Sequence, residues 1–325
     1  MKAIVCEQFG PPSSLVLKDL PALEAGEKEV VIEVKACSLN FPDTLIIQGK
    51  YQYKPELPFT PGSDIAGIVK AVGAKVKNVA VGDEVFGFVP NGGFAEEVVA
   101  PAKNVFPKPP LMNNAVGASF LMAYGTSYHA LKNRAQLKAG ETLVVLGASG
   151  GVGLAAVELG KLMGARVIAC ASSTEKLALC KEYGADEGIN YSEEDLKNRI
   201  KELTEGKGAD VIYDPVGDKF SEPALRAMAW EGRFLVVGFA AGDIPKIPLN
   251  LALLKGCQIV GVFWGSWAMQ FPNENMLNTM ELIQWHAQGK LKPHIHAVYP
   301  LEEAQKAMEE MMQRKVRGKI VIECS

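Results

Sequence analysis

The chain has 325 residues, of which 48% are hydrophobic and 22% are charged, and this suits a globular protein of about two domains. Its net charge of −3 excludes attraction by bulk electrostatics to a nucleic acid or an anionic membrane. It contains no run of about 20 apolar residues, and its start, MKAIVCEQFG, lacks the apolar core of a signal peptide. We therefore expect a cytoplasmic protein with no membrane span.

Short apolar runs recur between turn signals over the first hundred residues. The runs that we predict as strands are Ala3–Cys6, Leu15–Leu17, Val30–Val34, Ile65–Val69, Glu84–Phe86 and Phe94–Val99. This pattern is typical of an irregular, mostly antiparallel β domain.

The pattern changes near residue 114, where the Ala-rich segment Asn114–Lys132 predicts helices. After this segment, predicted strands and predicted helices alternate regularly along the chain. The predicted strands are Thr142–Leu146, Arg166–Ala171, Val211–Tyr213, Arg233–Val237 and Gln258–Val262, and the predicted helices are Gly151–Leu162, Glu175–Tyr183, Glu193–Thr204 and Lys219–Trp230. Such alternation predicts an α/β fold with a doubly wound parallel sheet.

The tail from about residue 263 differs again. It predicts helices over Asn275–Gln288 and Leu301–Arg314 and a last strand over Lys319–Glu323. We expect this tail to pack on the first, β-rich lobe. The cluster of Met308, Met311 and Met312 indicates packing rather than a cofactor site.

The six cysteines, Cys6, Cys37, Cys170, Cys180, Cys257 and Cys324, are scattered and form no CxxC pair. With no signal peptide in view, we interpret them as reduced thiols rather than as a disulfide framework.

A glycine-rich turn, Gly147-Ala148-Ser149-Gly150-Gly151-Val152-Gly153, lies between a predicted buried strand and a predicted helix. It matches GxGxxG with Ala148 in place of the first glycine. Gly150 lets the backbone approach a pyrophosphate, and Gly153 lets helix and strand pack closely. The helix N-terminus would offer N–H groups to the phosphates. The alternative, a plain glycine-rich turn, explains this context less well.

The end of the second strand of this unit favours NADPH over NADH. An enzyme that uses NAD usually has Asp or Glu here for the ribose 2′-hydroxyl. This chain instead has Ser172, followed by Lys176, which can donate a hydrogen bond and supply positive charge to a 2′-phosphate. Glu175 is expected to point outward in the first helical turn. A solvated helix lysine is the alternative role for Lys176.

Several motifs follow one another in a characteristic order. They are Asn40-Phe41-Pro42-Asp43, Gly49-Lys50-Tyr51, Pro61-Gly62-Ser63-Asp64, Val81-Gly82-Asp83-Glu84-Val85, the glycine turn, Ile189-Asn190-Tyr191, Trp230-Glu231-Gly232-Arg233 and Gly318-Lys319. Together they resemble the zinc-free, zeta-crystallin-like quinone oxidoreductases of the medium-chain dehydrogenase/reductase superfamily, and most closely the group of quinone oxidoreductase-like protein 2. The resemblance implies a GroES-like catalytic domain over residues 1–118 and 263–325, and a Rossmann NADP-binding domain over residues 119–262.

Zinc enzymes of this superfamily use a Cys and a His as catalytic ligands and carry a four-cysteine structural lobe. By resemblance, Asn40 stands at the Cys position and Ser63 at the His position, and no cysteine cluster follows Gly93. We therefore expect no metal site. We interpret Cys37 as a buried strand cysteine. The pair His294 and His296 has no acidic or cysteine neighbour in the sequence, so we do not expect it to bind metal.

The resemblance also implies roles for individual residues. Asn40, Asp43 and Tyr51 would line the cleft near the nicotinamide. The residues expected to bind the cofactor are Thr126, Ser149, Gly150, Gly151, Val152, Ser172, Lys176, Tyr191, Phe239, Phe263, Trp264, Gly265 and Arg317. Two cations and a phenol, Lys176, Arg317 and Tyr191, suit a 2′-phosphate. The alternative role for Tyr191 is that of a half-buried tyrosine at a helix entry.

Without zinc, no Lewis acid polarises a carbonyl, so an electron-poor acceptor is the better hydride acceptor. We therefore expect an NADPH-dependent quinone oxidoreductase. One alternative substrate is an α,β-unsaturated carbonyl, such as an alkenal or an enoyl thioester. A non-catalytic, crystallin-like NADPH-binding protein is a further alternative. By resemblance we expect a homodimer, paired through the strand Gln258–Val262.

Overall fold

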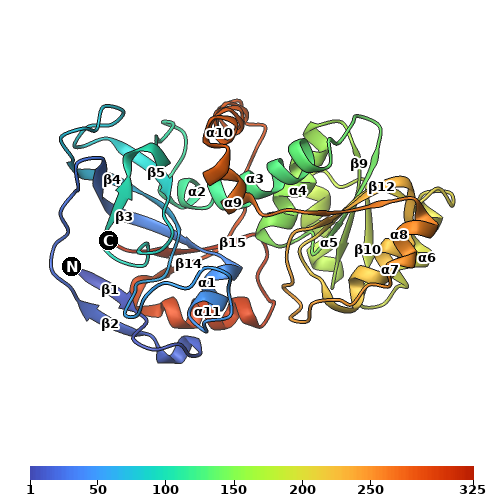
Figure 1. The fold of residues 1–325 in the computed structure, drawn as a ribbon, viewed down its shortest axis with the longest axis horizontal. Helices are drawn as coiled ribbons and strands as arrows, with labels where there is room; N and C mark the ends of the chain where they lie inside the picture. Colours follow the sequence, from blue (N-terminus) through green and yellow to red (C-terminus); the bar gives the residue numbers. More distant parts are fainter. The chain divides into compact units, whose positions relative to one another are not determined.

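The computed structural model describes all 325 residues. The chain forms two compact units (Figure 1). The first contains Met1–Met122 together with Pro293–Ser325, and the second contains Ala123–Lys292. No helix in the structure is long and apolar enough to cross a membrane.

The first unit is mostly β-structure. Its strands are β1 (Lys2–Val5), β2 (Val16–Asp19), β3 (Glu29–Leu39), β4 (Asp64–Val72), β5 (Glu84–Phe88), β6 (Glu97–Pro101), β7 (Val105–Pro107), β14 (Ile295–Pro300) and β15 (Lys319–Glu323). Strands β1 and β2 form a small antiparallel sheet. The main sheet has the order β14-β15-β3-β4-β5-β7, and β6 also pairs with β3. All of its pairs are antiparallel except β14 with β15. The predicted antiparallel character of this lobe is therefore correct.

Strand β3 organises the first unit because it pairs with three other strands, β4, β6 and β15. Its apolar side chains belong to a core that also includes Met308 of helix α11 (Ala304–Met312). Met311 packs against the same core, whereas Met312 is exposed. The expected packing role of the methionine cluster therefore holds for Met308 and Met311 only. The other helices here are α1 (Phe41–Ile46) and α2 (Asn114–Ala118), with short 3₁₀ turns at Pro12–Ser14, Ala102–Asn104 and Leu301–Glu303.

The second unit is built on a six-stranded sheet in which every pair is parallel. Its strands are β8 (Thr142–Leu146), β9 (Arg166–Ala171), β10 (Glu187–Asn190), β11 (Ala209–Asp214), β12 (Met228–Val236) and β13 (Gln258–Gly261). The sheet order is β10-β9-β8-β11-β12-β13. Numbered along the chain this is 3-2-1-4-5-6, the order of a dinucleotide-binding Rossmann sheet. The predicted doubly wound parallel sheet is confirmed.

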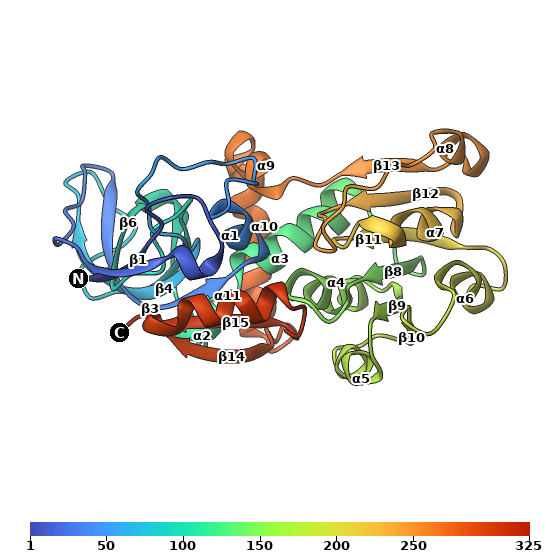
Figure 2. The ribbon, with the colours of Figure 1, turned by 90° about the horizontal axis from the view of Figure 1, so that it is seen from below.

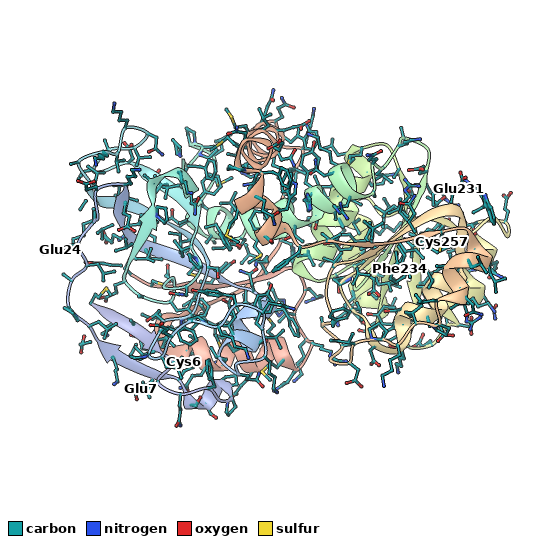
Figure 3. All side chains as sticks on the ribbon, in the orientation of Figure 1. Cys6, Glu7, Glu24, Glu231, Phe234 and Cys257 are labelled. Carbon is teal, nitrogen blue, oxygen red and sulfur yellow. The ribbon has the colours of Figure 1, made fainter.

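Helices precede, connect and follow these strands along the chain. They are α3 (Leu121–Tyr128, which begins at the end of the first unit), α4 (Gly151–Leu162), α5 (Thr174–Glu182), α6 (Leu196–Leu203), α7 (Ser221–Arg226), α8 (Asn250–Lys255), α9 (Trp264–Gln270) and α10 (Pro272–Ala287). A π-helical turn, His129–Arg134, continues α3, and a 3₁₀ turn, Asp218–Phe220, precedes α7. Helices α6, α7 and α8 contact one another in sequence (Figure 2). Their buried apolar side chains share a core with the strands, in which Phe234 is buried and Cys257 is partly buried (Figure 3).

One predicted helix is too long. The sequence Lys219–Trp230 was expected to be a single helix, but α7 ends at Arg226 and strand β12 begins at Met228. The register of β12 against β11 shifts after Met228, and Glu231 has a φ of 59°, which a helix cannot contain. Trp230 is consequently 72% exposed on the shifted segment.

The tail from about residue 263 was expected to pack on the first lobe; residues Pro293–Ser325 do belong to the first unit, but α9 and α10 belong to the second. Glu281 of α10 accepts hydrogen bonds from Tyr128 (2.6 Å) and Lys132 (2.7 Å), and Asn278 donates to Asn133 (2.9 Å). By contacts, the second unit therefore extends to Lys292, and the predicted domain bounds stay a prediction.

Candidate cofactor and active-site residues

The turn between β8 and α4 has no room for side chains at its key glycines. A Cβ on Gly153 would lie 2.2 Å from the carbonyl oxygen of Gly147, so helix α4 can approach the strand only with glycine there. Gly147 itself has a φ of +56°, which also favours glycine. No side chain caps the N-terminus of α4, which leaves its first N–H groups without a side-chain acceptor. This turn therefore fits the pyrophosphate of a dinucleotide.

Helix α3 is fastened to the same turn by a buried hydroxyl. Ser127 Oγ donates to the carbonyl oxygen of Val152 (2.7 Å) and lies 2.9 Å from the hydroxyl of Tyr213 on β11. The preceding residue, Thr126, is half-buried, and Ser149 in the turn is buried. These contacts fix the position of Thr126 relative to the turn. Ser127 and Tyr213 were not among the predicted site residues.

The predicted ring-binding residues of the second unit follow the carboxyl ends of its parallel strands. Trp264, just after β13, packs closely on Gly125 of α3. A Cβ on Gly125 would lie only 2.8 Å from ring atoms of Trp264. Trp264 Nε1 donates to Asn275 Oδ1 (3.0 Å). Phe263 is 54% exposed, and a Cβ on Gly265 would meet no atom within 4 Å. The turn, Trp264 and Thr126 are therefore arranged at one edge of the sheet, which is where open α/β sheets bind ligands.

Phe239 lies in the segment after β12. This segment lies beside the residues that come directly after β11, since the N–H of Ala240 donates to the carbonyl oxygen of Pro215 (3.0 Å). A Cβ on Gly217 would lie 2.8 Å from the Phe239 ring. Phe239 thus lies at the same sheet edge as the glycine turn.

A polar corner lies beyond β9 and β10. Lys176 Nζ donates to Ser172 Oγ (3.0 Å), and Ser192 Oγ donates to the carbonyl oxygen of Ser172 (3.2 Å). The backbone N–H of Tyr191 donates to the carbonyl oxygen of Ala171 (3.1 Å), and its ring lies 4.5 Å from that of Phe220, centroid to centroid. The structure thus brings Ser172, Lys176 and Tyr191 together.

The polar corner includes one residue that the sequence reasoning missed and lacks one that it included. Ser192 was not predicted to bind the cofactor, although it directly follows the predicted residue Tyr191 in the sequence. Arg317 belongs to the first unit, where it is exposed between α11 and β15, and its role stays a prediction. Glu175 is exposed in the first turn of α5, as expected.

In the first unit, Asn40 and Asp43 lie at the start of α1. Asn40 follows β3 and is the N-cap of the helix, and its backbone N–H donates to Asp43 Oδ2 (2.7 Å). Both residues are buried. Tyr51 is partly buried and packs against the core of this unit.

Two buried charged residues surround Asn40, and neither was predicted. Lys319, the first residue of β15, donates from Nζ to Asn40 Oδ1 and to the carbonyl oxygen of Leu39 (3.3 Å). Asp64, the first residue of β4, accepts from Asn40 Nδ2 (3.4 Å) and from the backbone N–H of Met122 (3.2 Å). We call Asn40, Asp43, Asp64 and Lys319 the Lys319 cluster.

Strand register produces this cluster. In the sheet order β15-β3-β4, Ile320 pairs with Leu39 and Ser38 pairs with Asp64. Positions far apart in the sequence therefore meet at the end of β3. In the sequence, Lys319 looks like the solvated first residue of an apolar strand, so only the pairing could reveal its burial.

Burial shifts the pKa values of the ionisable residues in the Lys319 cluster. It raises the pKa of the Asp43 carboxyl from its ordinary 3.8 to about 7, and the N–H of Asn40 and the charge of Lys319 offset part of this rise. It also raises the pKa of Asp64 to about 6 and lowers the pKa of Lys319, whose ammonium group the two carboxylates partly stabilise. Burial, together with the charge of Asp43, raises the pKa of Tyr51.

The residues at the zinc-ligand positions are engaged with the protein. Ser63 is buried, and its Oγ donates to the carbonyl oxygen of Pro90 (3.4 Å). Cys37 is buried in β3 as predicted, and burial raises the pKa of its thiol well above the ordinary value. His296 has an acidic partner from a distant part of the sequence, since its Nε2 lies 3.1 Å from Glu310 Oε1 on α11. No group of three or more His, Cys, Asp or Glu side chains in the structure could hold a metal ion.

Known proteins match both units. A family model described as a zinc-binding dehydrogenase matches residues 151–283, and one described as an alcohol dehydrogenase GroES-like domain matches residues 26–110. The chain is 40% identical over 325 residues to a Nematostella vectensis protein named quinone oxidoreductase-like protein 2 homolog, which covers 99% of this chain and 88% of that protein.

Solved structures also match nearly the whole chain. Escherichia coli quinone oxidoreductase complexed with NADPH aligns with a TM-score of 0.94 at 29% identity, covering 99% of this chain and all of that one (100%). A mycobacterial protein complexed with NADPH aligns with a TM-score of 0.93 at 30% identity, with coverage of 99% and 100%.

The fold and these matches define an oxidoreductase with a GroES-like domain and a Rossmann domain, as the sequence predicted. More specifically, the chain belongs to the medium-chain dehydrogenase/reductase superfamily, in its family of quinone oxidoreductase-like proteins.

Proposed function

We propose that this chain is an NADPH-dependent reductase that transfers a hydride to a quinone without zinc. The observation that carries the cofactor choice is the polar corner beyond β9. There Ser172 and Lys176 form a hydrogen-bonded pair at the position where an NAD enzyme would place a carboxylate. A carboxylate at that position would repel a 2′-phosphate, whereas an ammonium group and a hydroxyl attract it.

The cofactor is NADPH. Two solved structures that align over nearly the whole chain are NADPH complexes, and the polar corner suits the phosphate that distinguishes NADPH from NADH. The uncapped start of α4 would hold the pyrophosphate, and Lys176 and Ser172 would hold the 2′-phosphate. When bound, NADPH supplies the hydride and the protein supplies orientation and exclusion of water.

The donor set at the zinc-ligand positions supports a zinc-independent reaction. Asn40 Oδ1, the only acceptor atom of that side chain, already accepts a hydrogen bond from the Lys319 ammonium group. A positive charge next to this oxygen repels a second cation. The other position is a serine hydroxyl that is bonded to the backbone, whereas zinc prefers thiolate and imidazole ligands.

The acceptor is a quinone in this proposal, because a zinc-free enzyme does best with an acceptor that is already electron-poor. The names of the aligned relatives, quinone oxidoreductase and quinone oxidoreductase-like protein 2, support the same choice. The oxygen that becomes negative would accept hydrogen bonds from Asn40 or Tyr51. An α,β-unsaturated carbonyl remains the second candidate, since it has the same electronic character.

The experiment follows the loss of NADPH absorbance with two acceptors at equal concentrations, a simple para-quinone and a conjugated alkenal. We expect turnover with the quinone to exceed turnover with the alkenal. Faster turnover with the alkenal would identify α,β-unsaturated carbonyls as the acceptors of the enzyme. Tight NADPH binding without oxidation by either acceptor would contradict a reductase and favour a non-catalytic binding protein.

We further propose that the protein is a cytoplasmic homodimer. All six cysteines are free thiols, which suits a reducing compartment. Strand β13 is the last strand of its sheet and pairs only with β12. An edge of this kind suits pairing with a second copy of the chain.

A further inference from the structure

A lysine that the proposed mechanism does not use lies in the core of the first unit. Lys319 is 5% exposed, and its two hydrogen-bond acceptors, Asn40 Oδ1 and the carbonyl oxygen of Leu39, both lie at the end of β3. An ammonium group is seldom buried unless charged partners offset the loss of hydration. The partners here are Asp43 on α1 and Asp64 on β4, each 1% exposed.

These contacts determine the orientation of the Asn40 carboxamide. In the observed orientation, the oxygen accepts from Lys319, and the NH₂ group donates to Asp64 Oδ2 and to the carbonyl oxygen of Ser38, both at 3.4 Å. Rotating the amide by half a turn would place its NH₂ group against the ammonium group and its oxygen against the Asp64 carboxylate. Both contacts would then be repulsive, so only one orientation is stable.

The orientation affects the proposed chemistry directly. A carboxamide can stabilise a developing oxyanion only through its NH₂ group, because its oxygen would repel that charge. The two hydrogen bonds made by Asn40 Nδ2 are long, at 3.4 Å each, so the NH₂ group is held weakly while the oxygen is held by a charge-assisted bond.

We propose that Lys319 is a positioning residue that locks the Asn40 carboxamide with its NH₂ group available to the acceptor. The inference rests on the proposed function, in which Asn40 contacts the acceptor. Lys319 itself does not touch the substrate and acts through Asn40. Asp43 and Asp64 offset its charge and, together with the thiol of Cys37, are the ionisable groups that act on it electrostatically.

The first test observes the amide itself, in protein without cofactor. Asparagine is labelled with ¹⁵N, and the side-chain signals of Asn40 are assigned by their loss in Asn40→Ala. We expect Lys319→Met to shift or broaden these signals, because the amide then samples both orientations. Lys103→Met, a change at an exposed lysine of the same unit, should leave them in place. Unchanged Asn40 signals in Lys319→Met would overturn the proposal, whatever the acceptor of the enzyme.

The second test is kinetic. We expect Lys319→Met to lower kcat with the quinone by roughly a hundredfold, the cost of a misplaced transition-state donor, with an unchanged Kd for NADPH. In an Asn40→Ala background the same change should cost less than about twofold, because the two residues act as one unit. Equal losses in both backgrounds would show that Lys319 does not act through Asn40.

A third variant guards against a simple loss of folding. Lys319→Met/Asp64→Asn removes one charge of each sign, so the net charge of the Lys319 cluster stays the same and only Asp43 loses its cationic partner. We expect it to fold with near wild-type stability and yet to keep the low kcat. Recovery of kcat together with stability would reduce Lys319 to a structural role. If neither acceptor supports NADPH oxidation by the wild type, the proposed function fails. The Asn40 amide signals then still decide the role of Lys319.

Discussion

Two glycines of one turn are needed for different reasons. A Cβ on Gly153 would lie 2.2 Å from the carbonyl oxygen of Gly147, whereas a Cβ on Gly150 would meet nothing nearer than that same oxygen at 3.4 Å. The first contact is impossible for a side chain, and the second is an ordinary van der Waals contact. The fold therefore requires glycine at 153, and only a ligand would require it at 150.

This contrast gives a prediction for two alanine variants. Gly153→Ala should destabilise the second unit by roughly 1 to 3 kcal/mol, because the helix must move away from the strand. Gly150→Ala should keep the melting temperature of the wild type and raise the Kd for NADPH at least about tenfold, because the methyl group occupies space that the pyrophosphate needs. Thermal melts and NADPH titrations check both. Tight NADPH binding by Gly150→Ala would contradict the assignment of this turn.

Lys176 should distinguish the two nicotinamide cofactors. Its Nζ lies 3.0 Å from Ser172 Oγ, and a charge-assisted hydrogen bond to a phosphate contributes about 1.5 to 3 kcal/mol. Lys176→Ala should therefore raise the Kd for NADPH about tenfold to a hundredfold and leave the Kd for NADH nearly unchanged. Lys181→Ala, at an exposed site on the same helix, is the matched control. Equal losses for both cofactors would remove Lys176 from the 2′-phosphate site.

Asp43 should make stability depend on pH. Its pKa is about 7 in the folded protein and ordinarily 3.8, so the folded state binds this proton more tightly than the unfolded state. Its contribution to stability is therefore complete below about pH 3.8 and is lost as the pH rises through about 7. Between these values the wild type should lose up to a few kcal/mol relative to Asp43→Asn. Denaturant melts across this range check the difference, and parallel curves would contradict it.

Local patterns and distant pairings differ in how well the sequence predicts them. Ser172 and Lys176 are four residues apart at a strand end and a helix start, so their meeting could be predicted from local structure. Lys319 and Asp64 meet only because β15 and β4 flank β3 in a particular register. No local pattern encodes that register, and the buried cluster around Asn40 was therefore missed.

Among the elements, strand β13 and the helix before it, α8, expose large apolar side chains. Ile259 on this edge strand is 42% exposed, and Leu253 and Leu254 on the preceding helix α8 are 79% and 67% exposed. Large exposed apolar side chains next to an unpaired strand edge are typical of a protein interface.

A lysine at the edge should separate the proposed dimer. We expect the wild type to have about twice the chain mass of 35.0 kDa in light scattering, and Ile259→Lys to have the mass of one chain, because a charge at the edge opposes strand pairing. Leu111→Lys, at an exposed leucine of the first unit, should remain dimeric. A dimeric Ile259→Lys protein would place the interface elsewhere, and a monomeric wild type would contradict the dimer.

Elements with one clear periodicity were predicted best. The strands Thr142–Leu146 and Arg166–Ala171 and the helix Gly151–Leu162 have the predicted bounds. The helix predicted over Lys219–Trp230 was too long, because α7 ends at Arg226 and Met228 already pairs with Ala209 of β11. Helix α1 was not predicted, since its six residues are too few to show a period.

At the scale of the whole molecule, the residues proposed for function come from both units. The second unit holds the glycine turn and the polar corner proposed for NADPH, and the first holds Asn40, Tyr51 and the Lys319 cluster proposed for the acceptor. The return of residues 293–325 to the first unit is what brings Lys319 to Asn40. The central claim is that these residues reduce a quinone with NADPH and need no metal.

The most direct test is quinone-dependent oxidation of NADPH by protein that has been dialysed against a strong zinc chelator. The account predicts that turnover equals that of undialysed protein, that added zinc does not increase it, and that NADH supports it at least about tenfold less well at equal low concentration. Activity that disappears with the chelator and returns with zinc would contradict the account, as would equal use of NADH and NADPH.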